Sequence, residues 1–168
     1  MNNNDRVEIG LQASVEGFAN EHITAGILMK RYKNVSLVDL PLSPYDIIIV
    51  FKRGKGEDII RAQVKTAKKT VKFTGGTRGG ADRFYKSDVK VYRQSTKTAD
   101  VVIGIEPDKN ENKFNLYFIP TILIEALNQD SISINKIVEL KDNYEILEKC
   151  KDKSYVEKFC RKYSILKT

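Results

Sequence analysis

An almost uninterrupted apolar run at residues 47–51, Ile-Ile-Ile-Val-Phe, constrains the fold of this chain more than any other feature. A strand that lacks polar alternation has both faces covered, so it belongs inside a sheet with further layers around it. A polar turn with two glycines follows at residues 52–57, and a second strand pattern follows at residues 59–65. The two strands are therefore expected to form a hairpin within an α/β fold.

Residues 7–32 predict a long helix, because apolar and small residues recur there every three or four positions. The amphipathic stripe that results consists of Leu11, Val15, Phe18, Ala19, His22, Gly26 and Met29. His22 falls within this stripe, which favours a packed histidine over a metal ligand.

Further strands are expected at residues 35–40, 99–106 and 114–120. Thr121 is suited to be the N-cap of a short helix through residue 127, and the amphipathic stretch after Asn143 predicts a C-terminal helix. These elements predict a single α/β domain over residues 1–168. Its core, at about 7–127, is a mixed central β-sheet flanked by helices, and residues 128–168 form a small C-terminal helical addition.

The positive charge of the chain is concentrated in one segment. The whole chain has a net charge of +7, but residues 52–97 carry +10 and the remainder carries −3. Phosphate contacts supply most of the non-specific affinity for nucleic acid, so a segregated basic segment indicates a polyanionic partner, DNA above all. A merely solubilising surface is the alternative, although it gives no reason for the two signs to separate.

Several classes of site are excluded by composition. His22 is the single histidine, which leaves too few imidazoles for a zinc protease, a His-metal nuclease or a Ser-His-Asp hydrolase. The phosphate-binding pattern of P-loop enzymes does not occur. Cys150 and Cys160 form no zinc motif and are expected to be packing residues. Chemistry based on carboxylates and lysine remains.

Asp46, Gln63 and Lys65 are the strongest candidates for that chemistry. Asp46 opens the apolar strand, and Gln63 and Lys65 lie on one side of the next strand because strand side chains alternate. Phosphodiester hydrolysis needs hard oxygen ligands for Mg²⁺ and a cation near the attacking water. Asp46 and the amide oxygen of Gln63 are suited to bind the metal, for which Mn²⁺ is expected to substitute. Lys65 is suited to orient or deprotonate the water.

In these residues the sequence resembles the PD-(D/E)XK nuclease superfamily, which includes restriction endonucleases and Holliday junction resolvases. The resemblance rests on residues 43–46 (Ser-Pro-Tyr-Asp) and 61–67 (Arg-Ala-Gln-Val-Lys-Thr-Ala), with a glutamate-bearing helix ahead of them. It implies a restriction-endonuclease-like core in which Asp46 and Gln63 bind metal and Lys65 is the catalytic lysine. Two departures stand out: Gln63 replaces the second acid, as in Gln-x-Lys branches of the superfamily, and proline lies two positions before Asp46.

The resemblance also implies a metal ligand from the first helix, and Glu16 and Glu21 are both candidates. Glu21 lies at the border of the apolar stripe and is preferred, whereas Glu16 points further away and is better suited to solvent. Asp58 is either an accessory acid or a solubilising residue at the turn. The residues expected to grip DNA, with Tyr85 and Tyr92 interleaved, are Lys68, Lys69, Lys72, Arg78, Arg83, Lys86, Lys90 and Arg93.

The function implied is Mg²⁺-dependent DNA endonuclease activity in a homodimer. Restriction-type cleavage, junction resolution and homing-type cleavage remain open, and the long basic insert favours restriction-type use because it offers material for base contacts. A non-catalytic DNA-binding module is the main rival, supported by Gln63. An RNA-binding protein is a second rival, but its candidate stacking residues Phe114, Tyr117 and Phe118 have the pattern of strand core.

No apolar run is long enough to span a bilayer and no secretory signal pattern occurs, so a cytoplasmic location is expected.

Overall fold

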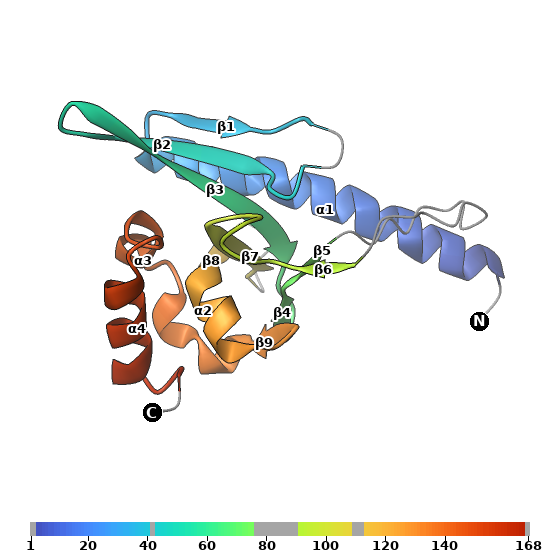
Figure 1. The fold of residues 1–168 in the computed structure, drawn as a ribbon. Coiled ribbons are helices and arrows are strands. Elements are labelled where there is room, and N and C mark those ends of the chain that lie inside the picture. The colour runs from blue at the N-terminus through green and yellow to red at the C-terminus, as the bar shows by residue number, and fades with distance from the viewer. Residues whose placement is uncertain (1–2, 41–42, 76–90, 109–112, 167–168) are drawn as a thin grey trace.

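A computed structural model describes residues 3–40, 43–75, 91–108 and 113–166. It is a mixed α/β structure, as expected, with a central sheet of five strands flanked by helices (Figure 1). The strands of the sheet are β1 (Val35–Leu37), β2 (Ile47–Arg53), β3 (Gly56–Thr66), β7 (Val101–Pro107) and β8 (Phe114–Pro120), and they lie in the order β1-β2-β3-β7-β8.

The predicted hairpin is the antiparallel pair β2–β3, in which Ile47 lies opposite Ala62. β3 then pairs in parallel with β7, and every other pairing in this sheet is antiparallel. The parallel pairing places β3 in the interior, where Ile60, Ala62 and Val64 are buried. The apolar run of β2 is buried at Ile47 and Ile49, so the strand that was expected to be covered does lie in the core.

Two short pairings lie outside the main sheet. β4 (Thr70–Lys72) pairs with β9 (Ser131–Ser133), and β5 (Thr74–Gly75) pairs with β6 (Tyr92–Arg93). The polar, basic stretch between residues 66 and 97 thus contains only short strands in its described part. Residues 76–90 lie outside the described residues.

Helix α1 (Asn3–Arg31) packs against β1 and β3, and its N-terminal half extends beyond the sheet (Figure 1). Its orientation differs from the expectation. The buried residues of the helix are Asn20, Thr24, Ala25 and Leu28. The predicted apolar stripe faces solvent instead, and Leu11, Val15, Phe18 and Met29 are 53%, 63%, 65% and 49% exposed.

The packed role expected for His22 is therefore wrong. Its ring is exposed, lies 4.3 Å from the Phe18 ring between centroids, and has Nδ1 2.9 Å from the Phe18 carbonyl oxygen. The sequence pattern identified an apolar stripe but could not show which face of the helix meets the sheet.

The C-terminal part packs around β8 through α2 (Thr121–Leu127), α3 (Tyr144–Glu148) and α4 (Lys153–Lys162), with the single-turn helices η1 (Ile134–Lys136) and η2 (Val138–Leu140) between them. The Thr121 hydroxyl donates to the carbonyl oxygens of Ala99 and Asp100, 2.9 and 3.1 Å away, so it ties α2 to the start of β7. Pro120 occupies the N-cap position, and the predicted capping role of Thr121 is wrong.

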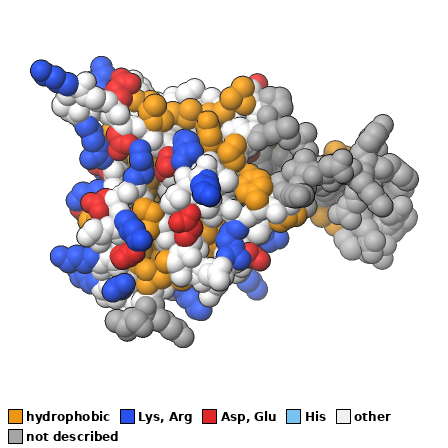
Figure 2. All heavy atoms as spheres, in the orientation of Figure 1, with side chains coloured by type: hydrophobic (Ala, Val, Ile, Leu, Met, Phe, Trp, Pro, Cys, Tyr) orange, Lys and Arg blue, Asp and Glu red, His pale blue; other side chains and the backbone are white. Residues whose placement is uncertain are grey.

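The segment after residue 127 shares one hydrophobic cluster with the sheet. Ile146, Leu147, Cys150, Val156 and Cys160 are all buried within it. The two cysteines are packing residues, as expected. Within the described residues no helix is both long and apolar enough to cross a membrane. The face drawn in Figure 2 mixes Lys and Arg with Asp and Glu, so this side carries no segregated charge.

Candidate active site

The candidate site forms where β2 begins beside the end of β3. The Asp46 backbone N–H donates to the Ala62 carbonyl oxygen at 2.9 Å, which continues the β2–β3 pairing by one residue. The Asp46 carboxylate bends over the neighbouring strand, where its Oδ2 accepts the Val64 backbone N–H at 2.7 Å and the Gln63 side-chain amide. Asp46 and Gln63, which the strand pattern placed side by side, are in direct contact.

Lys65 completes this group from the same side of β3. Burial lowers the pKa of the Lys65 ammonium, while the nearby carboxylates of Asp46 and Glu21 act in the opposite direction. Burial likewise raises the pKa of Asp46, against the Val64 N–H and the Lys65 charge. Lys65 is therefore a desolvated cation near two carboxylates. In such an arrangement the pKa values of the groups are shifted, which is common at catalytic sites.

Glu21 is the acid of α1 that reaches this group. Burial and the negative charge of Asp46 raise the pKa of Glu21 to about 7, against smaller effects of His22 and Lys65. The preference for Glu21 over Glu16 agrees with this position. The physical reason differs from the one given by the helical wheel. Glu21 is near the site because it borders the buried face that contains Asn20 and Thr24, and not because it borders the apolar stripe, which faces solvent.

Glu16 lies elsewhere, in an open groove beside the site. Its carboxylate is 3.6 Å from the Lys68 ammonium. The groove encloses about 360 Å³ and is lined by Ala13, Glu16, Lys65, Thr66, Lys68, Thr70 and Lys72. Three lysines, Lys65 among them, and two threonines thus line this opening.

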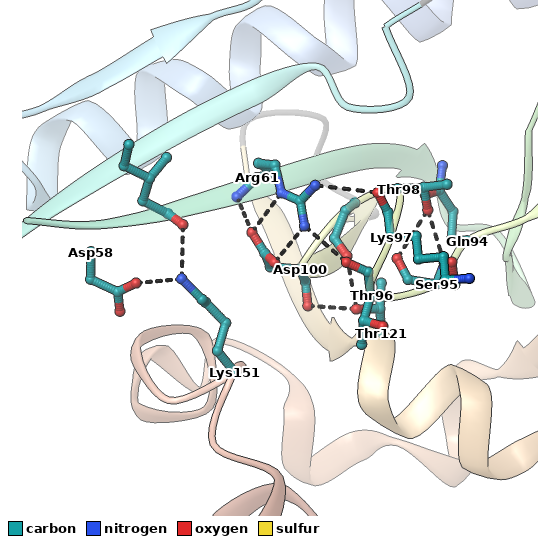
Figure 3. Close-up of polar contacts among 12 residues, drawn as sticks. Asp58, Arg61, Gln94, Ser95, Thr96, Lys97, Thr98, Asp100, Thr121 and Lys151 are labelled. Carbon is teal, nitrogen blue, oxygen red and sulfur yellow. Dashed lines mark hydrogen bonds and ion pairs between the residues drawn. The ribbon is translucent and has the colours of Figure 1, made fainter.

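Asp58 is remote from this group. It lies opposite Phe51 near the far end of the hairpin, five residues from Gln63, which is about 16 Å along a strand. Its carboxylate pairs with Lys151 at 2.6 Å (Figure 3) and also lies 3.5 Å from the Arg53 guanidinium. Asp58 therefore joins the hairpin to the C-terminal segment, and an accessory role at the site is wrong.

The residues expected to grip DNA divide into three groups. Lys68, Lys69 and Lys72 are exposed near the groove. Arg93 instead pairs with Asp130 at 2.8 Å and donates to Asn128 at 2.5 Å, so it ties β6 to the segment after α2. The remaining four, Arg78, Arg83, Lys86 and Lys90, lie outside the described residues.

Gln94 is a site residue that the sequence did not reveal. It is fully buried, and its side-chain amide donates to Gln63 Oε1 and to the Pro44 carbonyl oxygen, each at 3.1 Å. Gln94 Oε1 accepts from the Thr98 hydroxyl at 2.6 Å. These contacts direct the Gln63 amide nitrogen toward Asp46 and its oxygen toward Gln94.

The loop that carries Gln94 is itself fixed to β3 (Figure 3). The Arg61 guanidinium donates to Asp100 and to the Thr96 carbonyl oxygen, both at 2.9 Å, and to the Lys97 carbonyl oxygen at 3.3 Å. Glu125 of α2 accepts the Thr96 N–H and hydroxyl at 2.9 Å. The orientation of Gln63 is thus set by a network that spans β3, the start of β7 and α2.

Asn20 and Tyr92 also border the site. The buried Asn20 amide donates to the Thr66 hydroxyl at 2.8 Å, which joins α1 to the end of β3. Burial raises the pKa of Tyr92, and the negative charge of Asp46 adds to this effect. The local sequence gives no signal for Asn20, whereas Tyr92 had been noted only as an aromatic residue among basic ones.

Comparison with known proteins assigns no family. No protein-family model matches the chain, and no curated protein matches it significantly. Among solved structures, the chain is similar to a bacterial homing endonuclease, I-Ssp6803I, at 15% identity and a TM-score of 0.47. The match covers 71% of this chain and 76% of that one. A likeness of this extent assigns neither family nor activity to the chain.

Proposed function

We propose that this chain is a metal-dependent DNA endonuclease of the PD-(D/E)XK type, in its Gln-x-Lys variant, which hydrolyses phosphodiester bonds with Mg²⁺ or Mn²⁺. One observation carries the proposal. Glu21 comes from α1, Asp46 immediately precedes β2, and Lys65 comes from β3; the three influence one another electrostatically at one end of the hairpin. Two carboxylates and a desolvated lysine are the groups that such hydrolysis requires.

The donor set fits Mg²⁺. Asp46 and Glu21 both have raised pKa values from burial, and Asp46 adds repulsion at Glu21, so a divalent cation would relieve the cost of two ionised groups. The described residues contain no cluster of three or more His, Cys, Asp or Glu, so carboxylates alone do not enclose an ion. Mg²⁺ commonly binds through one or two carboxylates and keeps waters and substrate phosphates as its other ligands.

The protein residues have distinct roles in this proposal. Asp46 and Glu21 hold the metal, which when bound supplies charge that stabilises the phosphate and acidifies water. Lys65 orients the attacking water and accepts its proton in the deprotonated form that burial favours. Gln63 binds the metal through its amide oxygen only after the amide turns from its present orientation, in which the nitrogen faces Asp46.

The adjacent groove is suited to the DNA backbone. Lys68 and Lys72 supply positive charge, and Thr66 and Thr70 supply hydroxyl groups, in the groove that Lys65 also lines. Phosphate oxygens are commonly contacted by lysine ammonium groups and by serine or threonine hydroxyls. A phosphate in this groove would replace the Glu16 carboxylate as the partner of Lys68.

Three biological uses of the proposed cleavage activity are considered. Restriction-type, sequence-specific cleavage by a homodimer is favoured by the length of the basic segment, while junction resolution and homing-type cleavage are alternatives.

A DNA-binding module without catalytic activity is the rival to an endonuclease. The amide nitrogen of Gln63 on Asp46 favours that rival, because this contact satisfies the carboxylate without a metal. Tyr117 and Phe118 are buried, which removes the stacking surface an RNA reader would need.

Incubation with supercoiled plasmid tests the proposal. Cleavage is expected with Mg²⁺ or Mn²⁺, and EDTA should abolish it, because the two carboxylates alone provide no Lewis acid. Discrete fragments would identify restriction-type use, and cleavage of synthetic four-way junctions alone would identify resolution. DNA binding without cleavage under every metal condition would leave the DNA-binding module as the correct interpretation.

The rate of cleavage at subsaturating Mg²⁺ is expected to rise as the pH increases through about 7. Glu21 has a pKa of about 7, so it is protonated below this pH and competes poorly for the metal, and it is ionised above this pH. Glu21→Gln should flatten this rise, whereas Glu8→Gln, on an exposed part of the same helix, should leave it in place. A wild-type rate that falls over this range would contradict a ligand role for Glu21.

Gln63 variants separate metal binding from positioning. Gln63→Glu is expected to preserve or tighten Mg²⁺ binding, because a carboxylate is the stronger donor for a hard cation. Gln63→Leu should be inactive, since it removes both the oxygen donor and the contact to Asp46. Calorimetric titration with Mg²⁺ and a cleavage assay provide the measurements. An active Gln63→Leu variant would show that this position only packs.

Gln94→Leu is the companion variant. It keeps a buried side chain of similar size and removes the hydrogen bond that orients the Gln63 amide. Cleavage by Gln94→Leu should fall about tenfold or more. Mg²⁺ affinity measured by calorimetry should also fall in the wild-type background, yet it should change little in the Gln63→Leu background if Gln94 acts through Gln63. Equal losses in both backgrounds would assign Gln94 to structural stability alone.

A further inference from the structure

The solvent-facing stripe of α1 has no partner among the described residues. We define the α1 seam as Leu11, Val15, Phe18, His22 and Met29, all of which are exposed. Four of these five are large apolar side chains with 49% to 65% of their surface accessible. The seam follows the helix for about 27 Å, and a contiguous apolar surface of this length marks an interaction site.

The spacing of the seam fits another helix. Residues 11, 15, 18, 22 and 29 occupy d, a, d, a and a positions of a coiled-coil pattern. Ala25, at the remaining d position, is buried against the sheet, and the exposed Gly26 takes its place on this face. At the adjacent positions Ala19 and Gly26 are small and exposed, and a Cβ placed on Gly26 would meet nothing within 4 Å. The seam therefore has large apolar side chains that can insert into a second helix, and small residues beside them that let the second helix come close.

We propose that the α1 seam is the interface of a homodimer in which two α1 helices pack antiparallel. This extends the homodimer of the proposed function by naming its surface. In an antiparallel pair, a positions lie opposite d positions. Leu11 then meets Met29 of the second copy, Val15 meets the exposed Gly26, and Phe18 meets His22. Each bulky residue lies against a smaller or more flexible one, so the seam complements itself.

Charge selects the antiparallel arrangement over the parallel one. Glu8 lies near the start of α1 and Lys30 lies in its last turn, where Arg31 instead packs over the Tyr144 ring. Antiparallel pairing brings the acidic turn of one helix beside the basic turn of the other, whereas parallel pairing would place like charges together. The helix macrodipoles also oppose one another in the antiparallel pair.

The seam leaves the groove beside the candidate site open. Groove residues Ala13 and Glu16 lie on another face of α1, at about 140–160° from the Leu11 and Phe18 positions on a helical wheel. DNA and a second copy can therefore be bound together. The buried area is that of one short helix pair, so the association is expected to be modest, in the micromolar range. The C-terminal half of each helix is already ordered by the sheet, which lowers the cost of forming the pair.

Sedimentation of the full chain, without DNA or metal, over about 1 to 100 µM tests the interface. The wild-type protein should shift from monomer to dimer, and Phe18→Glu should remain monomeric throughout. Ile59→Glu is the matched control, because Ile59 is an apolar residue of β3 with 49% exposure outside the seam, and it should dimerise as the wild type does. Circular dichroism should confirm that both variants are folded.

Disulfide cross-linking tests the direction of the pair. Leu11→Cys mixed with Met29→Cys should cross-link, whereas Leu11→Cys alone should not. Burial raises the pKa of Cys150 to about 12 and of Cys160 to about 11, so the native thiols stay protonated and unreactive. A wild-type protein that is monomeric at every concentration would overturn the proposal, as would dimerisation of Phe18→Glu. Cross-linking of Leu11→Cys alone would overturn the antiparallel arrangement. None of these readouts depends on cleavage, so nuclease activity can fail or succeed independently.

Discussion

Replacing Lys65 with alanine is expected to lower the rate of DNA cleavage by about two to four orders of magnitude, the range contributed by a positioned acid or base. The ammonium is desolvated and lies near Asp46 and Glu21, so no other described group is placed to take its role in orienting the water. Single-turnover cleavage at saturating enzyme measures the chemical step.

Two controls separate chemistry from structure in this experiment. Lys65→Met keeps an unbranched side chain of similar length, and it should be as inactive as the alanine variant if the amine is what matters. Lys113→Ala, an exposed lysine before β8, should cleave at the wild-type rate. DNA affinity measured by anisotropy should fall only slightly for Lys65→Ala. Cleavage near the wild-type rate by that variant would remove Lys65 from the proposed mechanism.

Asp46→Asn is expected to abolish cleavage and to weaken Mg²⁺ binding by about 100-fold or more, because it removes the central charged ligand. The fold should survive, since an asparagine oxygen can still accept the Val64 N–H and the Gln63 amide that Asp46 accepts now. Calorimetric titration with Mg²⁺ provides the measurement.

The same variant has an expected effect on stability without metal. Burial raises the pKa of Asp46, so the folded state holds its proton more tightly than the unfolded state does. The ionised carboxylate therefore opposes folding at any pH above its ordinary pKa, and this cost reaches its full size above the raised pKa. At pH 8 in EDTA the Asn variant should melt at a higher temperature than the wild type, and the difference should shrink in acid. Unchanged metal affinity together with unchanged melting would contradict the placement of Asp46 as a buried ligand.

The sequence predicted the part of the site that depends on short-range geometry. Alternation along β3 placed Gln63 and Lys65 on one side, and the apolar run placed Asp46 at the entry of a buried strand. Both features follow from local rules of strand structure, and the β2–β3 pairing brings the three residues together as a hairpin must.

The contacts that were missed depend on packing between distant segments. Gln94 meets Gln63 across 31 positions, through a loop whose path depends on Arg61 and Asp100. The face of α1 was mistaken because a helix that extends beyond its sheet can carry an apolar stripe for another partner. Periodicity reports that a stripe exists and gives no information about what covers it. Thr121 is at the start of its helix, but its hydroxyl is engaged by β7 rather than by the helix end.

The closed β5–β6 pairing has a consequence for how such a protein can diversify. Thr74 lies opposite Arg93 and Gly75 opposite Tyr92, so the chain leaves and re-enters the body at adjacent points. Gln94 follows immediately and is hydrogen-bonded to Gln63 of β3, while β4 is paired with β9. The stretch between residues 75 and 92 can therefore be lengthened, shortened or exchanged without disturbing Asp46, Gln63 or Lys65. Under the proposed function, a change at this junction would alter the target preference and leave the proposed site of hydrolysis as it is.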